Sequence, residues 1–207
     1  MSKINVDTWE PESGNAATLM ASGDTVTVPS GAELDIASGA TLDVNGTIDV
    51  TGAITTGFPS NTPYFYAYLG SDQAPTDNTW TKVNIDTVSF QTGSTYNTTD
   101  KRWTPAVAGK YFLHIEGILR ADSSNKLSNA KAAIYKNGAV AMFYEGASQP
   151  ENTLTNCGIS ASAILDLDAD DYVEFWANIN VYSGNTSIAA TGGVAQATHF
   201  MGFKLVD

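Results

Sequence analysis

The sequence has little cysteine and few basic residues. Its 207 residues include one cysteine, Cys157, and ten Lys and Arg against 22 Asp and Glu, for a formal net charge of −12 at neutral pH. A single cysteine excludes an intramolecular disulfide framework and a metal site built from several cysteines. Because no Lys or Arg occurs from Ile4 to Thr81 and the others are scattered, we expect no surface for nucleic acid.

Long apolar runs are also missing. No stretch approaches the roughly 20 apolar residues that span a bilayer, and the N-terminus, Met1-Ser2-Lys3, lacks the apolar centre of a signal peptide. We therefore expect a soluble protein that does not insert into a membrane and is not exported through a signal peptide.

The abundant residues favour β-structure. The chain contains 18 Gly together with many Ser, Thr, Asn and Asp, whereas 43% of its residues are hydrophobic and 10% are aromatic. This composition is typical of a globular protein with many short strands and turns. Since no convincing amphipathic helix accompanies it, we predict an all-β fold.

A short aliphatic unit repeats within residues 23–57. The units are Val26-Thr27-Val28, Leu34-Asp35-Ile36, Leu42-Asp43-Val44, Ile48-Asp49-Val50 and Ala53-Ile54, with Gly-containing turns between them. Alternation places the aliphatic side chains of one unit on one face of a strand, but so few of them do not offset a backbone entropy of about 1–2 kcal/mol per residue. We predict a repetitive β stem that winds together with other copies of the chain; a solenoid within one chain and a flexible linker are the alternatives.

Residues 1–22 form a polar arm. Its one large aromatic side chain is Trp9, and Pro11 follows closely. A lone tryptophan in a polar segment is more plausibly an anchor into a partner than part of a core of its own. We interpret residues 1–22 as an attachment arm, with Trp9 and Pro11 as the anchor.

Longer strands are predicted in residues 58–207. They are Tyr64–Leu69, Thr81–Phe90, Tyr111–Leu119, Ala132–Lys136, Ala139–Phe143, Ile159–Leu165, Tyr172–Ile179 and His199–Val206. The pair Asn137-Gly138 between two of them is a strong signal for a two-residue hairpin. So many strands without a helix predict a sandwich or jelly-roll head.

Four motifs in this head resemble the complement-q and tumour-necrosis-factor family. In chain order they are Phe90, Gly93, Tyr96, Asn97, Trp103, Pro105, Gly109 and Tyr111; Ile134-Tyr135-Lys136-Asn137-Gly138; Leu165 to Trp176; and Phe200-Met201-Gly202-Phe203-Lys204-Leu205. The resemblance covers Pro63 to Asp207 and implies a jelly roll that assembles as a homotrimer. Ala169-Asp170-Asp171 replaces the usual Gly-Asp of one turn, so we expect Asp170 to adopt a left-handed conformation.

The first 57 residues, an arm followed by an acidic β repeat, are similar in plan to fibre and decoration proteins of tailed bacteriophages. This second resemblance implies a virion structural protein, assembled in the host cytoplasm and displayed on the outside of the particle, whose arm binds other virion proteins. We expect the head to bind a host-surface glycan or receptor. A passive decoration protein that stabilises the particle, or a lectin-like module of a bacterial surface, are the alternatives.

No arrangement of catalytic residues is recognisable, so we expect neither an enzyme nor a cofactor. His114 and His199 are predicted to lie on strands, with no nucleophile motif near them, and we expect both to be structural.

Three tyrosines, Tyr64, Tyr66 and Tyr68, alternate along one predicted strand with apolar residues. If the apolar residues face the core, the tyrosines share the opposite face, and we predict that they form the trimer interface. Trp80 and Tyr182, close to predicted loops, are candidates for stacking on a sugar ring.

Asp166, Asp168 and Asp170 are candidates for binding calcium, because several carboxylates fall within a short segment. The segment lacks the turn glycine and the distal glutamate of a calcium loop. A solvated turn is therefore the favoured interpretation, and we expect no metal site.

Overall fold

A computed structural model of the chain describes residues 61–94, 96–148, 150–191 and 196–205, together with residues 25, 27, 28, 41, 43–45 and 47. The backbone divides into two units, Met1–Ala53 and Ile54–Asp207. The predicted attachment arm, residues 1–22 with Trp9 and Pro11, lies outside the described residues, and so does most of the predicted stem, residues 23–57.

Twelve strands, and no helix, occur in the described part of the Ile54–Asp207 unit. They are β1 (Tyr64–Tyr68), β2 (Thr81–Lys82), β3 (Thr87–Thr92), β4 (Tyr96–Asn97), β5 (Arg102–Trp103), β6 (Gly109–Ala121), β7 (Leu127–Lys136), β8 (Ala139–Ser148), β9 (Asn156–Leu167), β10 (Val173–Val181), β11 (Thr186–Ala189) and β12 (His199–Lys204). The predicted all-β class is confirmed.

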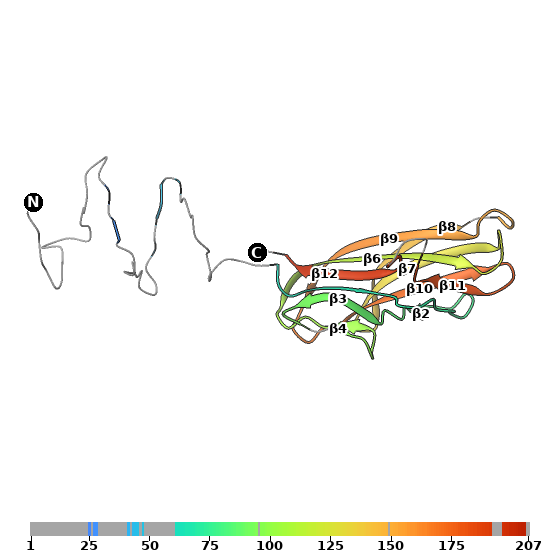
Figure 1. Ribbon diagram of the computed structural model, residues 1–207, viewed down its shortest axis with the longest axis horizontal. Helices are drawn as coiled ribbons and strands as arrows, with labels where there is room; N and C mark the ends of the chain where they lie inside the picture. Colours follow the sequence, from blue (N-terminus) through green and yellow to red (C-terminus); the bar gives the residue numbers. More distant parts are fainter. Residues whose placement is uncertain are drawn as a thin grey trace, which may run out of the picture. The chain divides into compact units, whose positions relative to one another are not determined.

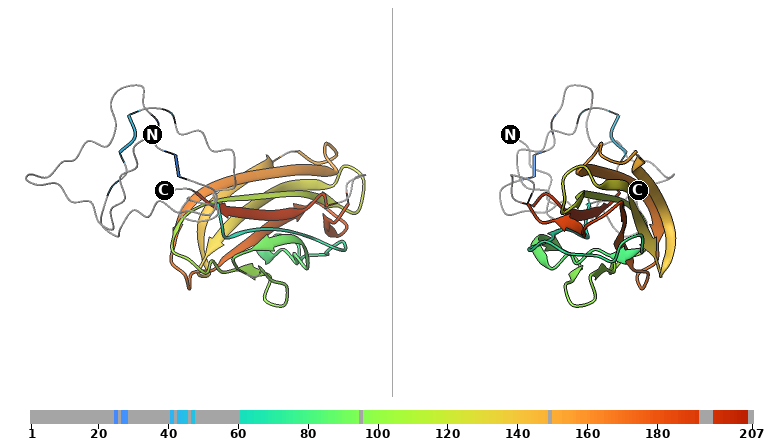
Figure 2. Two further views of the ribbon diagram at one scale, coloured as in Figure 1. Left: turned by 60° about the vertical axis from the view of Figure 1, so that its left-hand side comes forward. Right: turned by 90° about the vertical axis from the view of Figure 1, so that its right-hand side faces the viewer.

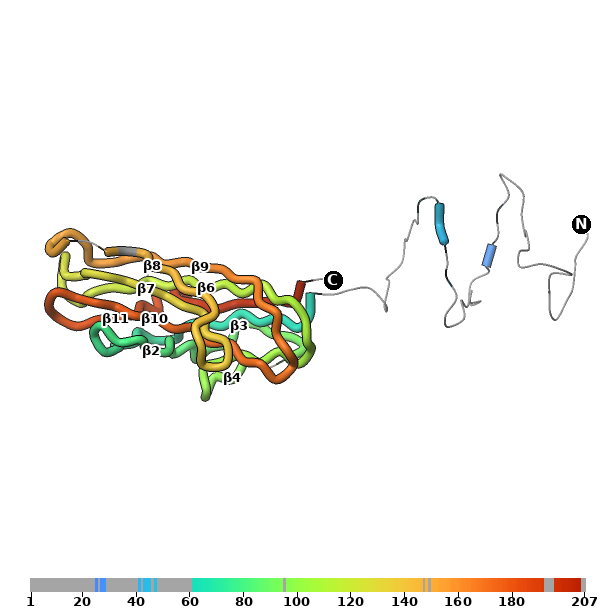
Figure 3. Tube along the Cα trace, turned by 180° about the vertical axis from the view of Figure 1, so that it is seen from behind, coloured from blue at the N-terminus to red at the C-terminus, as the bar shows by residue number. Residues whose placement is uncertain are grey.

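The strands form two antiparallel sheets, which can be followed in Figures 1 and 2. Sheet A has the order β3-β1-β12-β6-β9, and β11 pairs with the end of β6 beyond β12. Sheet B has the order β4-β5-β10-β7-β8, and β2 also pairs with β10. Each sheet therefore contains strands from both halves of the unit, as the view from behind in Figure 3 shows.

The connections identify the sandwich as a jelly roll. The chain changes sheets after β1, β2, β3, β5, β6, β8, β9 and β10, so that β1-β12-β6-β9 faces β5-β10-β7-β8. In this arrangement the first and last strands of the domain lie side by side, and hairpins cross from one sheet to the other. The predicted jelly-roll sandwich is confirmed.

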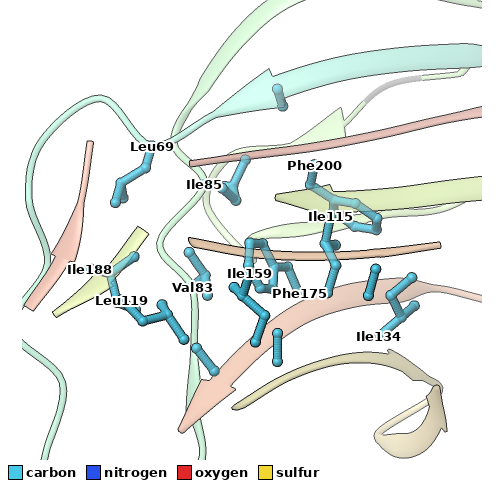
Figure 4. Packing of buried hydrophobic residues seen from close by; sticks show 14 of the residues in the cluster. Leu69, Val83, Ile85, Ile115, Leu119, Ile134, Ile159, Phe175, Ile188 and Phe200 are labelled. Carbon is cyan, nitrogen blue, oxygen red and sulfur yellow. The ribbon is translucent and has the colours of Figure 1, made fainter. Parts of the chain in front are cut away.

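One hydrophobic core fills the space between the sheets. Phe65, Ala67 and Leu69 are buried in it, as the alternation of their strand predicted, and Figure 4 shows further core side chains from both sheets. Burying one such large side chain stabilises the fold by roughly 1.5–3 kcal/mol.

The β7–β8 hairpin has the predicted two-residue turn. Asn137 and Gly138 have φ angles of 51° and 79°, the left-handed values that this turn requires. The expectation for Asp170 is wrong, because Asp170 is not among the described residues with positive φ. The Asp171 carboxylate instead accepts a hydrogen bond from the Asp168 N–H at 2.8 Å, which closes the turn with ordinary backbone angles.

The prediction of one continuous strand over Thr81–Phe90 is wrong, because the strand is interrupted between Lys82 and Thr87. The segment is divided into β2, which pairs with β10 in sheet B, and β3, which pairs with β1 in sheet A. Val83 and Ile85 lie between β2 and β3, where the chain crosses from one sheet to the other. Both side chains are fully buried in the core between the sheets.

Candidate functional site

The outer face of sheet A carries three rows of side chains that cross its strands. Strand pairing places Ile164, Phe112, Phe203 and Tyr64 in the first row, Ser162, His114, Met201, Tyr66 and Phe90 in the second, and Ser160, Glu116, His199 and Tyr68 in the third. Residues of one row lie within reach of each other across the strands. Tyr64, Tyr66 and Tyr68 thus share the outer face, as predicted; their role in an interface stays a prediction.

Aromatic rings make a connected surface in the first two rows. The Phe90 ring stacks on Tyr66 with centroids 5.4 Å apart and meets Tyr64 edge-on at 6.0 Å, and Phe112 lies 5.2 Å from Phe203. We call the set Tyr64, Tyr66, Phe90, Phe112, Phe203 and Ile164 the aromatic face.

Much of the aromatic face is open to solvent in the single chain. Ile164 is 63% exposed and Phe90 is 56% exposed. Tyr64, Phe90 and Phe203 also line a hollow on this face. Contiguous exposed apolar surface is common at sites where proteins bind partners.

His114, Glu116 and His199 meet where the second and third rows join. The Glu116 Oε2 atom lies 3.8 Å from Nε2 of His114 and 3.7 Å from Nε2 of His199. The two imidazole rings have centroids 5.9 Å apart. Sequence reasoning treated the histidines as separate structural residues and missed this cluster.

The other nitrogen of each imidazole has an oxygen partner. The His199 Nδ1 atom lies 3.2 Å from the carbonyl oxygen of Gln196, and the His114 Nδ1 atom lies 2.8 Å from the Ser162 hydroxyl. Both Nε2 atoms therefore point toward the same carboxylate. The spacing of His114 and Glu116, two residues apart on a strand, could have indicated part of this arrangement from the sequence.

Tyr66 borders the cluster. Its ring stacks on His199 with centroids 5.1 Å apart. Burial, and then the negative charge of Glu116, raise the pKa of the Tyr66 hydroxyl above its ordinary value. The phenol therefore stays neutral to a higher pH than an ordinary tyrosine, and its neutral form can donate a hydrogen bond.

The two candidates for sugar stacking lie on different elements. Trp80 packs on the outside of sheet B, with ring centroids 6.3 Å from Tyr135 and 6.0 Å from Phe143. Tyr182 follows β10, and its backbone N–H donates to the carbonyl of Lys126. Tyr135 also stacks on Trp176 at 4.8 Å, so the structure places Trp80 in an aromatic cluster that the sequence did not indicate.

The calcium candidates do not converge. Asp166, Asp168 and Asp170 are all exposed on the β9–β10 turn and the strand before it. Across the described ranges, the group of three metal-ligating side chains whose ligand atoms lie within 4.8 Å of one another is His114, Glu116 and His199.

No helix in the described part of the chain has the length and hydropathy needed to cross a membrane.

Comparison with known proteins finds similarity to solved structures and not to sequences or family models. No protein-family model matches the chain, and no curated protein matches its sequence. Among solved structures, the chain is similar to the Eiger TNF of S. frugiperda, with 13% sequence identity and a TM-score of 0.48, over 72% of this chain and 95% of that chain. The jelly-roll assignment rests on the strand order described above, and the predicted virion role stays a prediction.

Proposed function

We propose that this chain is the subunit of a homotrimeric, non-enzymatic structural protein of a virion, a bacteriophage fibre or a capsid or tail decoration protein. In this proposal the arm, residues 1–22, binds other virion proteins and the jelly-roll head binds a host-surface glycan or receptor on the outside of the particle. The polar arm and the aliphatic repeat in the sequence support the virion role.

The single observation that carries the trimer is the exposed aromatic face. It combines aromatic side chains that touch one another with one exposed aliphatic side chain, Ile164, and aromatic residues are enriched in the cores of protein interfaces. Its most economical occupant is another copy of the same chain, since the predicted stem also needs other copies to bury its aliphatic side chains.

The position of β1 favours the same occupant. Tyr64, the first residue of β1, belongs to the aromatic face, and Asn61 lines the hollow on the same face, so the chain enters β1 beside this surface. Association of three heads through the aromatic face would therefore bring the starts of three β1 strands close together. Winding of the stems and packing of the heads then support one another.

Sedimentation velocity of the full chain at micromolar concentration tests the trimer. We expect a species of three times the chain mass of 21.9 kDa. Ile164→Lys places a charge in the aromatic face and should dissociate the trimer, while Val140→Lys is a matched control, because Val140 is 54% exposed but lies on β8 of sheet B. A monomeric wild-type chain, or an Ile164→Lys variant that stays trimeric, would refute the proposed interface.

The virion role and the head's ligand need separate experiments. Antibody labelling of purified particles is expected to place the chain on their outer surface, and absence from the particles would contradict the virion role. Binding to host-surface polysaccharide is expected without cleavage, because the proposal includes no enzymatic step. New reducing ends after incubation would contradict that part, whereas absence of binding would favour a passive decoration protein.

A further inference from the structure

We propose that His114, Glu116 and His199 bind a divalent transition-metal ion of the zinc class, through the Nε2 atoms of both histidines and the carboxylate of Glu116. All three ligands belong to one subunit. The site can therefore form within a single chain, whether or not the chain assembles as a trimer.

The distances within the cluster are longer than direct hydrogen bonds and close to those between ligands of one ion. Both Nε2 atoms lie 3.7–3.8 Å from Glu116 Oε2, longer than the 2.7–3.2 Å of an N–H···O hydrogen bond. Two ligands of a tetrahedral zinc ion, with bonds of about 2.0–2.2 Å, lie roughly 3.4 Å apart. The ligand atoms of the three groups all lie within 4.8 Å of one another, so the side chains would move inward to hold an ion between them.

The hydrogen bonds on the far side of each ring prepare the nitrogen that would bind metal. A carbonyl oxygen only accepts, so the contact with Gln196 fixes the proton of His199 on Nδ1 and leaves the lone pair on Nε2. The Ser162 hydroxyl can accept from Nδ1 of His114 in the same way. Histidines that ligate metals characteristically donate their other N–H to such an oxygen.

The sheet holds the ligands in place. His114 and Glu116 are two residues apart on β6, and His199 of β12 is in register with Glu116. The ring of Tyr66 stacks on His199, and the ring of Phe112 lies nearly parallel to His114, with 7° between the ring planes. Ligands carried on paired strands and supported by packed rings are preorganised, so little entropy is lost when the ion binds.

The ligand types select the class of ion. Imidazole nitrogen with carboxylate suits zinc, cobalt and nickel, whereas calcium and magnesium prefer oxygen ligands alone. Both histidines are partly shielded from solvent, but the side chain of Glu116 is 51% exposed, which leaves a route by which an ion can enter. Three protein ligands also leave a coordination position for water or a further group.

Titration of the tag-free full chain with Zn²⁺ by calorimetry, and with Co²⁺ by visible absorption, tests the site. We expect one ion per chain and d–d absorption bands from bound Co²⁺. Because His114 and His199 are the two histidines of the sequence, a tag-free chain has no competing imidazole. The absence of saturable binding to the wild-type chain would overturn the proposal.

Variants separate this site from nonspecific binding. Glu116→Gln and His199→Gln each remove a ligand and should abolish the Co²⁺ bands. Ser162→Ala removes only the hydrogen-bond partner of His114 and should weaken zinc affinity about tenfold. Asp166→Asn removes an exposed carboxylate elsewhere on β9 and should leave binding unchanged; equal affinity in Glu116→Gln and in the wild type would refute the assignment.

The result of the metal titration can be told apart from the result of the sedimentation test for the trimer. A chain that sediments as a monomer but binds one Co²⁺ ion supports the metal site and refutes the interface. A chain that sediments as a trimer but binds no metal supports the interface and refutes the metal site. Circular dichroism of each variant checks that the β-fold is retained.

Discussion

Replacing Asp171 by asparagine removes a carboxylate that joins the β9–β10 turn to the β7–β8 hairpin. One carboxylate oxygen lies 2.7 Å from Lys136 Nζ and accepts the Asp168 N–H, and the other accepts a hydrogen bond from the Asn137 side chain at 2.5 Å. Hydrogen bonds from Lys136, then from Asp168 and Asn137, lower the pKa of Asp171 from 3.8 to about 2. The charged form is therefore favoured in the folded chain.

The lowered pKa sets the size and the sign of the effect. One pKa unit corresponds to about 1.4 kcal/mol, so the lowering is equivalent to roughly 2.5 kcal/mol of folding free energy at neutral pH. Because the Lys136 side chain is 34% exposed and partly screened, we expect a loss of about 1–2 kcal/mol in Asp171→Asn. The contribution is complete well above the ordinary pKa of 3.8 and is lost as the pH falls through about 2.

Urea unfolding of the wild type and of Asp171→Asn, at one protein concentration and at several pH values, measures the difference. The gap in unfolding free energy should be largest near neutral pH and should narrow as the pH approaches 2. Asp170→Asn is the control, because Asp170 is the exposed neighbour on the same turn, and its stability should stay within about 0.5 kcal/mol of the wild type. A gap that is equally large at both ends of the pH range would refute the electrostatic reasoning.

Two further predictions concern packing. A Cβ atom on Gly202 would lie 2.6 Å from Leu113 Cδ2 and 3.0 Å from the carbonyl oxygen of Phe112, so Gly202→Ala should lower the unfolding free energy by about 1–3 kcal/mol. Gly158→Ala is the control and should leave the unfolding free energy nearly unchanged, because a Cβ atom there meets nothing within 4 Å apart from its chain neighbours. Equal stabilities of the two variants would contradict this account. Cys157 is buried, and burial raises the pKa of its thiol. The folded chain should therefore react with a disulfide reagent far more slowly than the urea-unfolded chain. Equal reaction rates would show that the thiol is accessible in the folded chain.

Local patterns in the sequence were sufficient where a strand has one buried face. The alternation of Phe65, Ala67 and Leu69 with tyrosines predicted both the strand and its orientation, because burial on one side of a sheet imposes a period of two. The Asn137-Gly138 turn was predictable for a similarly local reason, since few residues adopt two successive left-handed conformations.

Features that depend on distant pairing were not predictable in this way. β4 and β5 have two residues each and exist because they pair with each other and, through β5, with β10. β11 was also missed, since its position beside the end of β6 follows from the jelly-roll connections rather than from its own residues. The histidine cluster has the same origin, because only the pairing of β12 with β6 brings His199 to Glu116.

The aromatic face and the metal site share the second row of sheet A, and this proximity has a thermodynamic consequence. Tyr66 belongs to the aromatic face and stacks on His199. A partner that packs on Tyr66 can therefore shift the His199 ring, which is one of the proposed metal ligands. If ion binding strengthens association of the chains by some factor, association must strengthen ion binding by the same factor. Comparing zinc affinity in the wild type and in Ile164→Lys therefore measures how far the two proposals are coupled, since Ile164 itself makes no part of the ligand set.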